Sequence, residues 1–595
     1  MTLFKRVRLL HRKHKSSRKT QSTFTEIILP VTHRIRVFAF PEDREAQEEA
    51  NNEKIYRELP DHLLQTRSFL QLAALNGDQE AVRTLISQGE SVNAVNTVDA
   101  VNGRQGEPWY RNHPLTALHA AVEGGHNEIV DYLLTSGSDP NSNMEFWGTP
   151  LIIAVRKHNT EIADTLLRRG ADVNQLAGYH TADPLQRASY EGNLPMVDLL
   201  LEYGANVNGR TAVCGFGPAI VAAAASDNAR VIERLVDEGA DINAVQCYSR
   251  GQLHEMRQNA LGRAITWGRV QAVDMLLRRG ADMHMECEYG NAVQSAAYFG
   301  WEEIFDDLIA RGADPYQPTE SFANVLEAAV AGGQGLMFQK LLALGMDIHF
   351  DCTVAGTLLH VAVMSGEDSI VGYLLDWLDV NQEGGVFGTA LIAAASRGNT
   401  STCQLLIARG ADLLFQDVHG CPMHHAVEYN NVKTVNLLLD AGTPIDTVGG
   451  KIGTALQFAA MGNSEEAVHL LLDRGADVNT QSGYYGNALQ AWSYTGNQEI
   501  VQHLLDKGAD PLALGGFYGT ALIAALHRGH ESIVQLLIKY GADVEPRTSA
   551  FGTALEYATS LKERSIHHEE QEVYARVIQN LSKFECSIET PFSQR

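Results

Sequence analysis

The sequence predicts an all-α solenoid of about 15 stacked helix-turn-helix units with hairpin loops between them. One observation is a period of 33 residues, which holds through the last four steps between Cys421 and Thr553. The others are a column of Ala at one position of the unit and a Gly near its end. A fixed period of this length indicates one supersecondary unit that buries its apolar faces only against its neighbours.

Each unit opens at a residue suited to begin a helix. Of the 15 opening positions, 13 hold Ser, Thr, Asp or Asn, whose side chains accept a hydrogen bond from the free amides of a first helical turn. We call these positions the anchors of repeats 1 to 15 and predict that each is an N-cap. The anchors are Ser68, Thr116, Thr149, Asp183, Pro218, Asn259, Asn291, Asn324, Thr357, Thr389, Cys421, Thr454, Asn487, Thr520 and Thr553.

Two further columns define the helices of a unit. Ala stands five residues after the anchor in 14 of 15 units, which predicts a helix packed too closely for a larger side chain. Trp492 is the exception, and it indicates either a weak point in the stack or a position where Ala491 and Ser493 make room. Gly stands 21 residues after the anchor in 13 of the first 14 units, repeat 9 being the exception, and predicts the left-handed end of a second helix.

Three motifs resemble those of the ankyrin repeat. They are Thr116-Ala117-Leu118-His119, the Gly-His-x-Glu-Ile-Val of Gly125–Val130, and the Gly-Ala-Asp-Val-Asn of Gly170–Asn174 and Gly475–Asn479. The variant at Tyr485–Gln490 is similar to the ankyrin arrays of filamentous fungi. The resemblance covers residues 68 to about 582 and implies an ankyrin solenoid that binds proteins, without indicating which.

The segments outside the repeats are residues 1–67 and a C-terminal tail at 583–595. Residues 1–60 carry 13 Lys and Arg against 8 Asp and Glu, and no acid precedes Glu26. We predict a basic, largely flexible N-terminal region with a capping helix over Glu42–Leu59. A nuclear-import patch at Arg12–Lys19 and a mitochondrial presequence are the alternatives.

Charge and cysteine usage limit the class of protein. The net charge is −25, and since residues 1–60 contribute +5, the remainder carries −30. An array this acidic repels phosphate backbones, which disfavours general nucleic-acid binding. The sequence has no apolar run of membrane length and no Cys-x-x-Cys motif. We therefore predict a monomer without a membrane span in a reducing compartment, cytoplasmic or, through the basic N-terminal region, nuclear.

No spaced catalytic constellation stands outside the repeat pattern, so we predict no enzymatic activity, no cofactor and no metal site. Gly449–Lys451 resembles the end of a phosphate loop, but Ile452 stands where that loop needs Ser or Thr. The segment His419–His425 holds three His and one Cys, as a metal cluster does. Cys421 is an anchor and His424 matches the His of the Thr-Ala-Leu-His start, which favours structural roles.

The predicted function is a scaffold that binds partner proteins on the concave face formed by hairpins and first helices. Two inserts lengthen the hairpin side and carry aromatic and Arg residues, the types enriched at binding hot spots. These candidates are Trp109, Tyr110 and Arg111 in the first insert, and Tyr248, Arg250, His254 and Arg257 in the second. A tolerated surface loop is the alternative interpretation of each insert.

An aromatic residue also stands two residues before the anchor in 8 of 15 units. These residues are Trp147, Phe216, Tyr289, Phe322, Phe387, Tyr485, Tyr518 and Phe551. We predict that each ring packs on the neighbouring hairpin. The alternative is a ladder of partner contacts, for which Trp147, Tyr289, Phe387, Tyr485 and Tyr518 are the candidates. A second class of function is a regulatory or sensor array that acts with an effector domain or enzyme.

Overall fold

The computed structural model describes residues 69–95, 115–144, 147–176, 182–209, 217–249, 255–353, 356–385, 387–545, 551–565 and 567–588. The chain forms two compact units, Met1–Ala329 and Val330–Arg595, which are described separately below. The predicted capping helix at 42–59 and the first insert lie outside the described residues.

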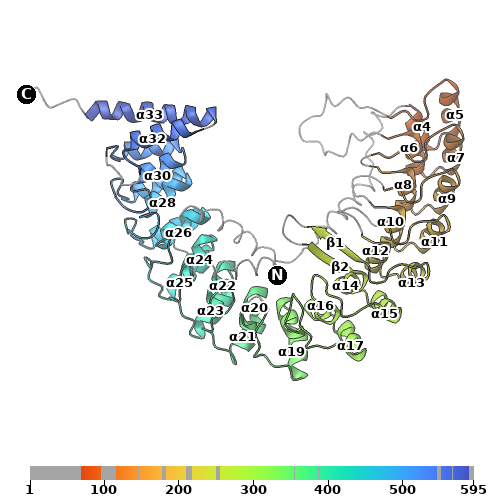
Figure 1. The fold of residues 1–595 in the computed structure, drawn as a ribbon, viewed down its shortest axis with the longest axis horizontal. Helices are drawn as coiled ribbons and strands as arrows, with labels where there is room; N and C mark the ends of the chain where they lie inside the picture. The colour runs from red at the N-terminus through yellow and green to blue at the C-terminus, as the bar shows by residue number, and fades with distance from the viewer. Residues whose placement is uncertain are drawn as a thin grey trace, which may run out of the picture. The chain divides into compact units, whose positions relative to one another are not determined.

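Helices follow one another in pairs, one pair to a repeat, and within each unit the first helices form one layer and the second helices another (Figure 1). The helices that begin in the first unit are α4 (Phe69–Asn76), α5 (Gln79–Ser87), α6 (Ala117–Gly124), α7 (Asn127–Thr135), α8 (Pro150–Arg156), α9 (Thr160–Arg168), α10 (Pro184–Tyr190), α11 (Leu194–Glu202), α12 (Ala219–Ser226), α13 (Ala229–Asp237), α14 (Ala260–Thr266), α15 (Val270–Arg278), α16 (Ala292–Phe299), α17 (Glu302–Ala310) and α18 (Val325–Ala331).

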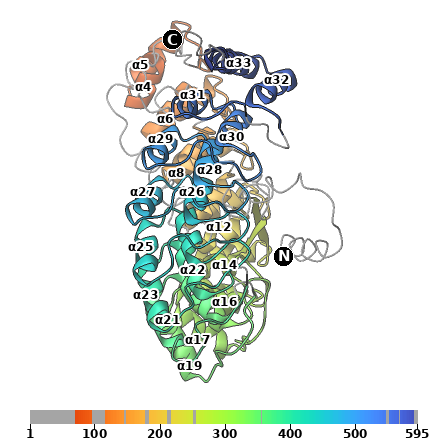
Figure 2. The same ribbon diagram turned by 90° about the vertical axis from the view of Figure 1, so that its left-hand side faces the viewer.

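Figure 2 shows the helices of the second unit stacked in chain order. They are α19 (Gly335–Ala343), α20 (Leu358–Ser365), α21 (Asp368–Leu374), α22 (Ala390–Arg397), α23 (Thr400–Ala408), α24 (Pro422–Glu428), α25 (Val432–Asp440), α26 (Ala455–Gly462), α27 (Glu465–Asp473), α28 (Ala488–Thr495), α29 (Gln498–Asp506), α30 (Ala521–His527), α31 (Glu531–Lys539), α32 (Ala554–Arg564) and α33 (His568–Ile588). The 30 helices in the described ranges correspond to 15 repeats, which confirms the predicted fold. Among these helices, none has the length and apolarity needed to cross a bilayer.

The anchors begin the first helices for the predicted reason. The Thr116 hydroxyl accepts the N–H of His119, and Asp183 forms a reciprocal capping box with Gln186. Pro218, which has no side-chain acceptor, makes no such cap. Thr357 makes no such cap either, although its hydroxyl donates to the His360 ring at 2.7 Å, as that of Thr116 does to the His119 ring.

The Gly and Ala columns have separate causes. All 13 Gly residues that end second helices have φ between 82° and 103°, a left-handed conformation that favours glycine. A Cβ at any of them would meet no atom within 4 Å, so backbone conformation rather than space selects Gly there. The 14 Ala residues of the first helices are all buried, as predicted, and Trp492 in their column is fully buried too.

A polar residue three positions after the anchor ties many repeats to the loop that precedes the next repeat. The buried His119 ring donates from Nε2 to the Gly148 carbonyl at 3.0 Å. In the second unit, Gln490 donates from Nε2 to the Gly519 carbonyl at 3.1 Å. Each such bond joins one first helix to the following hairpin, so buried polar groups are satisfied between neighbours.

An Asn on the hairpins makes a second link, which we call the Asn latch. The Asn479 amide donates to the Gly508 carbonyl at 3.0 Å, and its oxygen accepts the Asp510 N–H at 2.8 Å. The same pair of bonds is made by Asn93, Asn141, Asn174, Asn208 and Asn381. Leu512, which is 53% exposed, holds this position in the next hairpin.

We expect Leu512→Asn to raise stability, because Gly541 and Asp543 stand where Gly508 and Asp510 stand for Asn479. Two new hydrogen bonds are worth about 1–2 kcal/mol together, and little burial is lost from an exposed Leu. The reciprocal change Asn479→Leu is expected to lower stability by a similar amount. Urea unfolding of both variants measures the effect, and a loss of stability in Leu512→Asn would contradict it.

The second insert forms an antiparallel ribbon of β1 (Val245–Ser249) and β2 (Glu255–Asn259), visible in Figure 1. Val245 pairs with Asn259, and Tyr248 pairs with Met256. The ribbon ends at Asn259, the anchor of repeat 6, so the insert lengthens the hairpin side of the array, as predicted.

Candidate protein-binding surface

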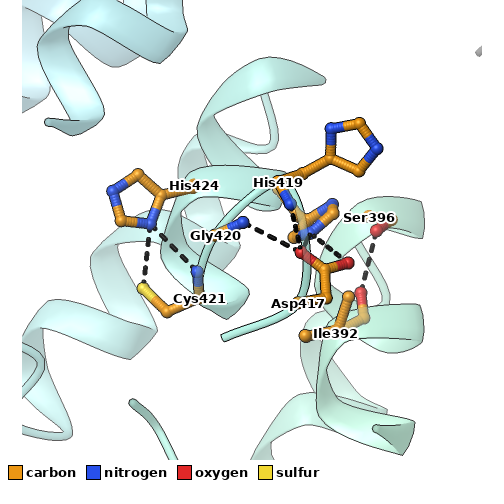
Figure 3. Close-up of polar contacts among 8 residues, drawn as sticks. Ile392, Ser396, Asp417, His419, Gly420, Cys421 and His424 are labelled. Atoms are coloured by element: carbon orange, nitrogen blue, oxygen red, sulfur yellow. Dashed lines mark hydrogen bonds and ion pairs between the residues drawn. The ribbon is translucent and has the colours of Figure 1, made fainter. Parts of the chain in front are cut away.

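The His- and Cys-containing segment of repeat 11 is built around Asp417 (Figure 3). One Asp417 oxygen accepts the backbone N–H groups of His419 and Gly420 at 2.8 and 2.9 Å. The His425 ring donates from Nε2 to the same carboxylate at 3.1 Å. Burial pushes the pKa of Asp417 up, but His425 and the two N–H donors outweigh it and hold the pKa below its usual value.

His424 points into the helix packing rather than toward His425. Its Nε2 donates to the Thr447 carbonyl at 2.9 Å, and its Nδ1 accepts the Cys421 N–H at 3.1 Å. Within the described ranges, no three His, Cys, Asp or Glu side chains group so as to hold a metal ion. These bonds are the structural roles that the repeat register predicted for Cys421 and His424.

Gly449–Lys451, the sequence that resembles a phosphate loop, lies in a hairpin. The Gly449 N–H donates to the Gly453 carbonyl at 2.8 Å, and the two glycines form an antiparallel bridge. Lys451 is exposed at the tip. The segment does not continue directly into a helix, as a phosphate loop does, because the anchor Thr454 comes between.

The structure describes few of the insert candidates. Trp109, Tyr110, Arg111, Arg250 and His254 lie outside the described residues. Tyr248 is placed by its backbone in β1, and Arg257 is exposed in β2. Partner binding by both inserts therefore stays a prediction.

The described members of the aromatic column two residues before the anchor are buried or half-buried, and Phe216 lies outside the described residues. Trp147, Phe387 and Tyr518 are 8%, 9% and 4% exposed. In the first unit, the Tyr289 ring lies 4.7 Å from Tyr298 and 4.9 Å from Phe299, measured between centroids. These contacts are those of the packing interpretation, and partner binding by this column stays a prediction.

In repeats 13 to 15, this inner column joins rings of the first helices into one cluster. Tyr494 of α28 lies 5.5 Å from Tyr485 and 5.2 Å from Tyr518, and Tyr518 lies 5.1 Å from His527 of α30. Burial raises the pKa of Tyr485 to about 12 and also raises the pKa of Tyr518. The cluster is therefore a packed aromatic layer beneath the hairpin tips.

The exposed aromatic column stands one residue earlier, three residues before the anchor. Tyr484 and Phe517 are 44% and 49% exposed, and their rings stack at 5.0 Å with 14° between planes. Sequence reasoning missed these residues although a signal was present. That signal is a second aromatic residue directly before the inner one, Tyr484 before Tyr485 and Phe517 before Tyr518.

Backbone hydrogen bonds fix the outer rings in place. The Tyr484 N–H donates to the Lys451 carbonyl at 2.8 Å, and the Phe517 N–H donates to the Tyr484 carbonyl at 2.7 Å. The hairpin tips are thus joined edge to edge along the array. Gly483 makes this approach possible, because a Cβ there would overlap the Ile452 carbonyl group.

We expect Gly483→Ala to cost more stability than Gly508→Ala. Both residues have positive φ, 63° and 92°, so either Ala is strained by about 1–2 kcal/mol. Only Gly483 also meets backbone, which adds an overpacking cost of about 1–3 kcal/mol. Urea unfolding of the two variants measures the difference. Equal losses of stability would show that the hairpin tips move apart at little cost to make room for the added methyl group at position 483.

Exposed aliphatic side chains stand on the hairpin that carries Phe517 and on the hairpin before that of Tyr484. Leu512 and Leu514 are 53% and 65% exposed on the former, and Val448 is 46% exposed on the latter. We call Val448, Tyr484, Leu512, Leu514 and Phe517 the hairpin patch. A run of large apolar side chains on neighbouring hairpins is typical of an interaction site, whereas isolated ones are ordinary.

Comparison with known proteins places these repeats in a family. A family model described as ankyrin repeats in three copies matches the chain nine times, between residues 49 and 287 and between 325 and 568. A human transient receptor potential cation channel, subfamily A member 1, is 26% identical over 427 residues, which are 62% of this chain and 37% of the channel. The ankyrin repeat domain-containing protein SAT10 of the fungus Stachybotrys chartarum is 26% identical over 301 residues, which are 48% of this chain and 14% of SAT10.

Among solved structures, the ankyrin repeat domain of human ASB11 aligns with a TM-score of 0.34 and 26% identity, over 37% of this chain and 98% of that domain. This chain thus spans well under two thirds of the length of the channel and of SAT10. The paired helices, the left-handed Gly ends and the family model agree across most of the sequence. The chain belongs to the ankyrin-repeat family.

Proposed function

We propose that this chain is a non-enzymatic scaffold that binds partner proteins through the hairpin and first-helix face, with the hairpin patch as a principal contact. Ankyrin repeats are in general protein–protein interaction modules, and the family match covers most of the chain. The observation that carries the proposal is the stacked pair Tyr484 and Phe517, about half exposed on hydrogen-bonded hairpin tips.

The physical reason is preorganisation. Aromatic side chains supply large contact areas, and they are enriched among residues that dominate binding energy. Tyr484 and Phe517 are already ordered by their mutual stacking and by backbone bonds, so binding sacrifices little further side-chain freedom.

The test begins by identifying a partner at the patch. A photo-crosslinking amino acid replaces Leu514 in one variant and Leu344 in another, since both side chains are 65% exposed. Leu344 is the C-cap of α19, outside the hairpin patch, and serves as the matched control. Proteins captured from cell extract at position 514 but not at 344 are identified by mass spectrometry.

Phe517→Ser is then expected to weaken binding of the captured partner about tenfold or more, the loss typical of a hot-spot aromatic. Leu344→Ser is expected to leave the affinity unchanged. Isothermal titration calorimetry compares the two variants, with thermal melts to show that both fold. Equal affinity of Phe517→Ser and unsubstituted protein for the partner would show that the hairpin patch is not part of the binding face.

A regulatory or sensor array is the second candidate function. The observation that favours it is the length of the relatives, because this chain matches 37% of the human channel and 14% of SAT10. Related arrays thus occur inside longer proteins. Sequencing the full-length transcript tests this proposal, and an open reading frame that joins the repeats to an effector domain would support it.

A further inference from the structure

We propose that the hairpin patch binds an extended, positively charged segment of a partner protein that carries an apolar side chain at about every third residue. This inference rests on the proposed function, because it specifies the partner of the same patch.

The charge of the partner follows from the hairpins themselves. Across residues 442–454, 475–487 and 508–520, the acids are Asp446, Asp477 and Asp510, and the base is Lys451. Asp477 and Asp510 are exposed. The Oδ1 atoms of Asp477 and Asp510 each accept a backbone N–H at 2.9 Å, from Asn479 and Leu512 respectively, which holds both carboxylates at the base of the patch.

A further carboxylate lies on the first-helix side of repeat 11. Glu428 is the last residue of α24, and burial raises its pKa, while the charges of His425 and His419 lower it and that of Asp417 raises it. Among the described residues, no side chain forms a hydrogen bond to this carboxylate. A Lys or Arg from a partner would replace the hydration that Glu428 has lost.

The spacing of the partner's side chains follows from the geometry of the hairpins. Each repeat adds one layer of packed helices, so the array advances by about 10 Å per repeat. An extended chain advances about 3.3 Å per residue, so about three residues cross one repeat. One apolar side chain in three therefore meets each successive hairpin, and the residues between face the carboxylates.

Two other occupants are disfavoured by the same charges. Nucleic acid would meet carboxylates at the patch and a chain of net charge −25. A second copy of this chain would bring its own acidic hairpins against these. The experiment below also tests whether nucleic acid or a second copy of the chain binds the patch.

The probes are dye-labelled peptides of about 12 residues, enough to cross about four hairpins. The first repeats Leu-Lys-Pro, in which Pro prevents a helix. The second replaces each Lys with Glu, and the third gathers the same Leu, Lys and Pro residues into three blocks. Fluorescence polarisation measures the affinity of each peptide for the full chain.

We expect the Leu-Lys-Pro peptide to bind at least about tenfold more tightly than its Glu counterpart, and more tightly than the block peptide. Phe517→Ser should weaken it about tenfold, and Leu344→Ser should leave it unchanged. Added salt should weaken the Lys peptide, since exposed charges are screened.

The charge argument has its own variant, Asp477→Asn with Asp510→Asn. Asn keeps the oxygen that accepts the backbone N–H, as Asn206 does for Asn208 at 3.1 Å, so the hairpins should fold. We expect this double variant to lose most of the preference for Lys over Glu.

Equal or tighter binding of the Glu peptide would overturn this inference, while the proposed function would still stand on the captured partner. Binding of the Lys peptide that is insensitive to Phe517→Ser would also overturn it. So would single-stranded DNA that competes at the patch, or a dimer, seen by sedimentation, that Phe517→Ser dissociates.

Discussion

Replacing Trp492 with Ala is expected to lower the stability of the second unit by about 3–5 kcal/mol, the usual cost of deleting a large buried aromatic side chain. The indole is fully buried in α28, and its Nε1–H donates to the Leu456 carbonyl of the preceding repeat at 3.2 Å. The substitution therefore leaves a cavity between repeats 12 and 13 and removes the hydrogen bond that joins them there.

Urea unfolding and amide hydrogen exchange across repeats 12 to 14 measure this loss, because stacked repeats need not unfold in one step. Trp377→Ala is the matched control, since that side chain is 64% exposed in the same unit and should change stability by less than about 0.5 kcal/mol. A rise in stability in Trp492→Ala would show instead that the indole strains the stack, which is the weak-point interpretation of its column.

Acid is expected to destabilise the array through His119 and His424. Burial lowers the pKa of each from 6.5 to about 4, although hydrogen bonds to the Gly148 and Thr447 carbonyls oppose the shift. Because the folded pKa lies below the unfolded one, the unfolded state binds more protons between these values. The contribution of each buried, neutral His to the free energy of unfolding is fully present above pH 6.5. It is lost as the pH falls toward 4, by about 3 kcal/mol per His.

His424→Gln isolates this effect. Gln already stands at the same repeat position in Gln457 and Gln490, where its Nε2 donates to the following loop at 2.9 and 3.1 Å. The variant should keep the hydrogen bond and lose the titration, so its urea midpoint should fall less than that of unsubstituted protein between pH 6.5 and pH 4. Carboxylates titrate equally in both proteins, so parallel curves would show that His424 does not contribute.

The columns that recur every 33 residues were predictable because each records a local requirement. An anchor such as Thr116 needs an acceptor at a helix start, Gly541 needs a left-handed end, and Ala459 needs a close neighbour. Each requirement arises within one helix or one contact, so the same residue type recurs at the same position of every repeat and can be recognised in the sequence.

The links between repeats were not predictable in the same way. A period shows which positions are equivalent, but it does not show that Gln490 reaches the loop before the next anchor. The exposed pair Tyr484 and Phe517 was missed because the more frequent aromatic column, one residue later, is the one that packs inward. Local period therefore predicts the core better than it predicts the surface that a partner meets.

The position of the Asn latch has a consequence for how such an array diversifies. Where Asn381 and Asn479 stand, the hairpins are joined; where Leu414 and Leu512 stand, the same position exposes an apolar side chain. A single substitution at this position therefore removes the hydrogen bonds between neighbouring hairpins and exposes an apolar side chain that a partner can contact. We expect Leu512→Asn to melt at a higher temperature and to bind its partner more weakly, so that selection for recognition opposes selection for robustness at this residue.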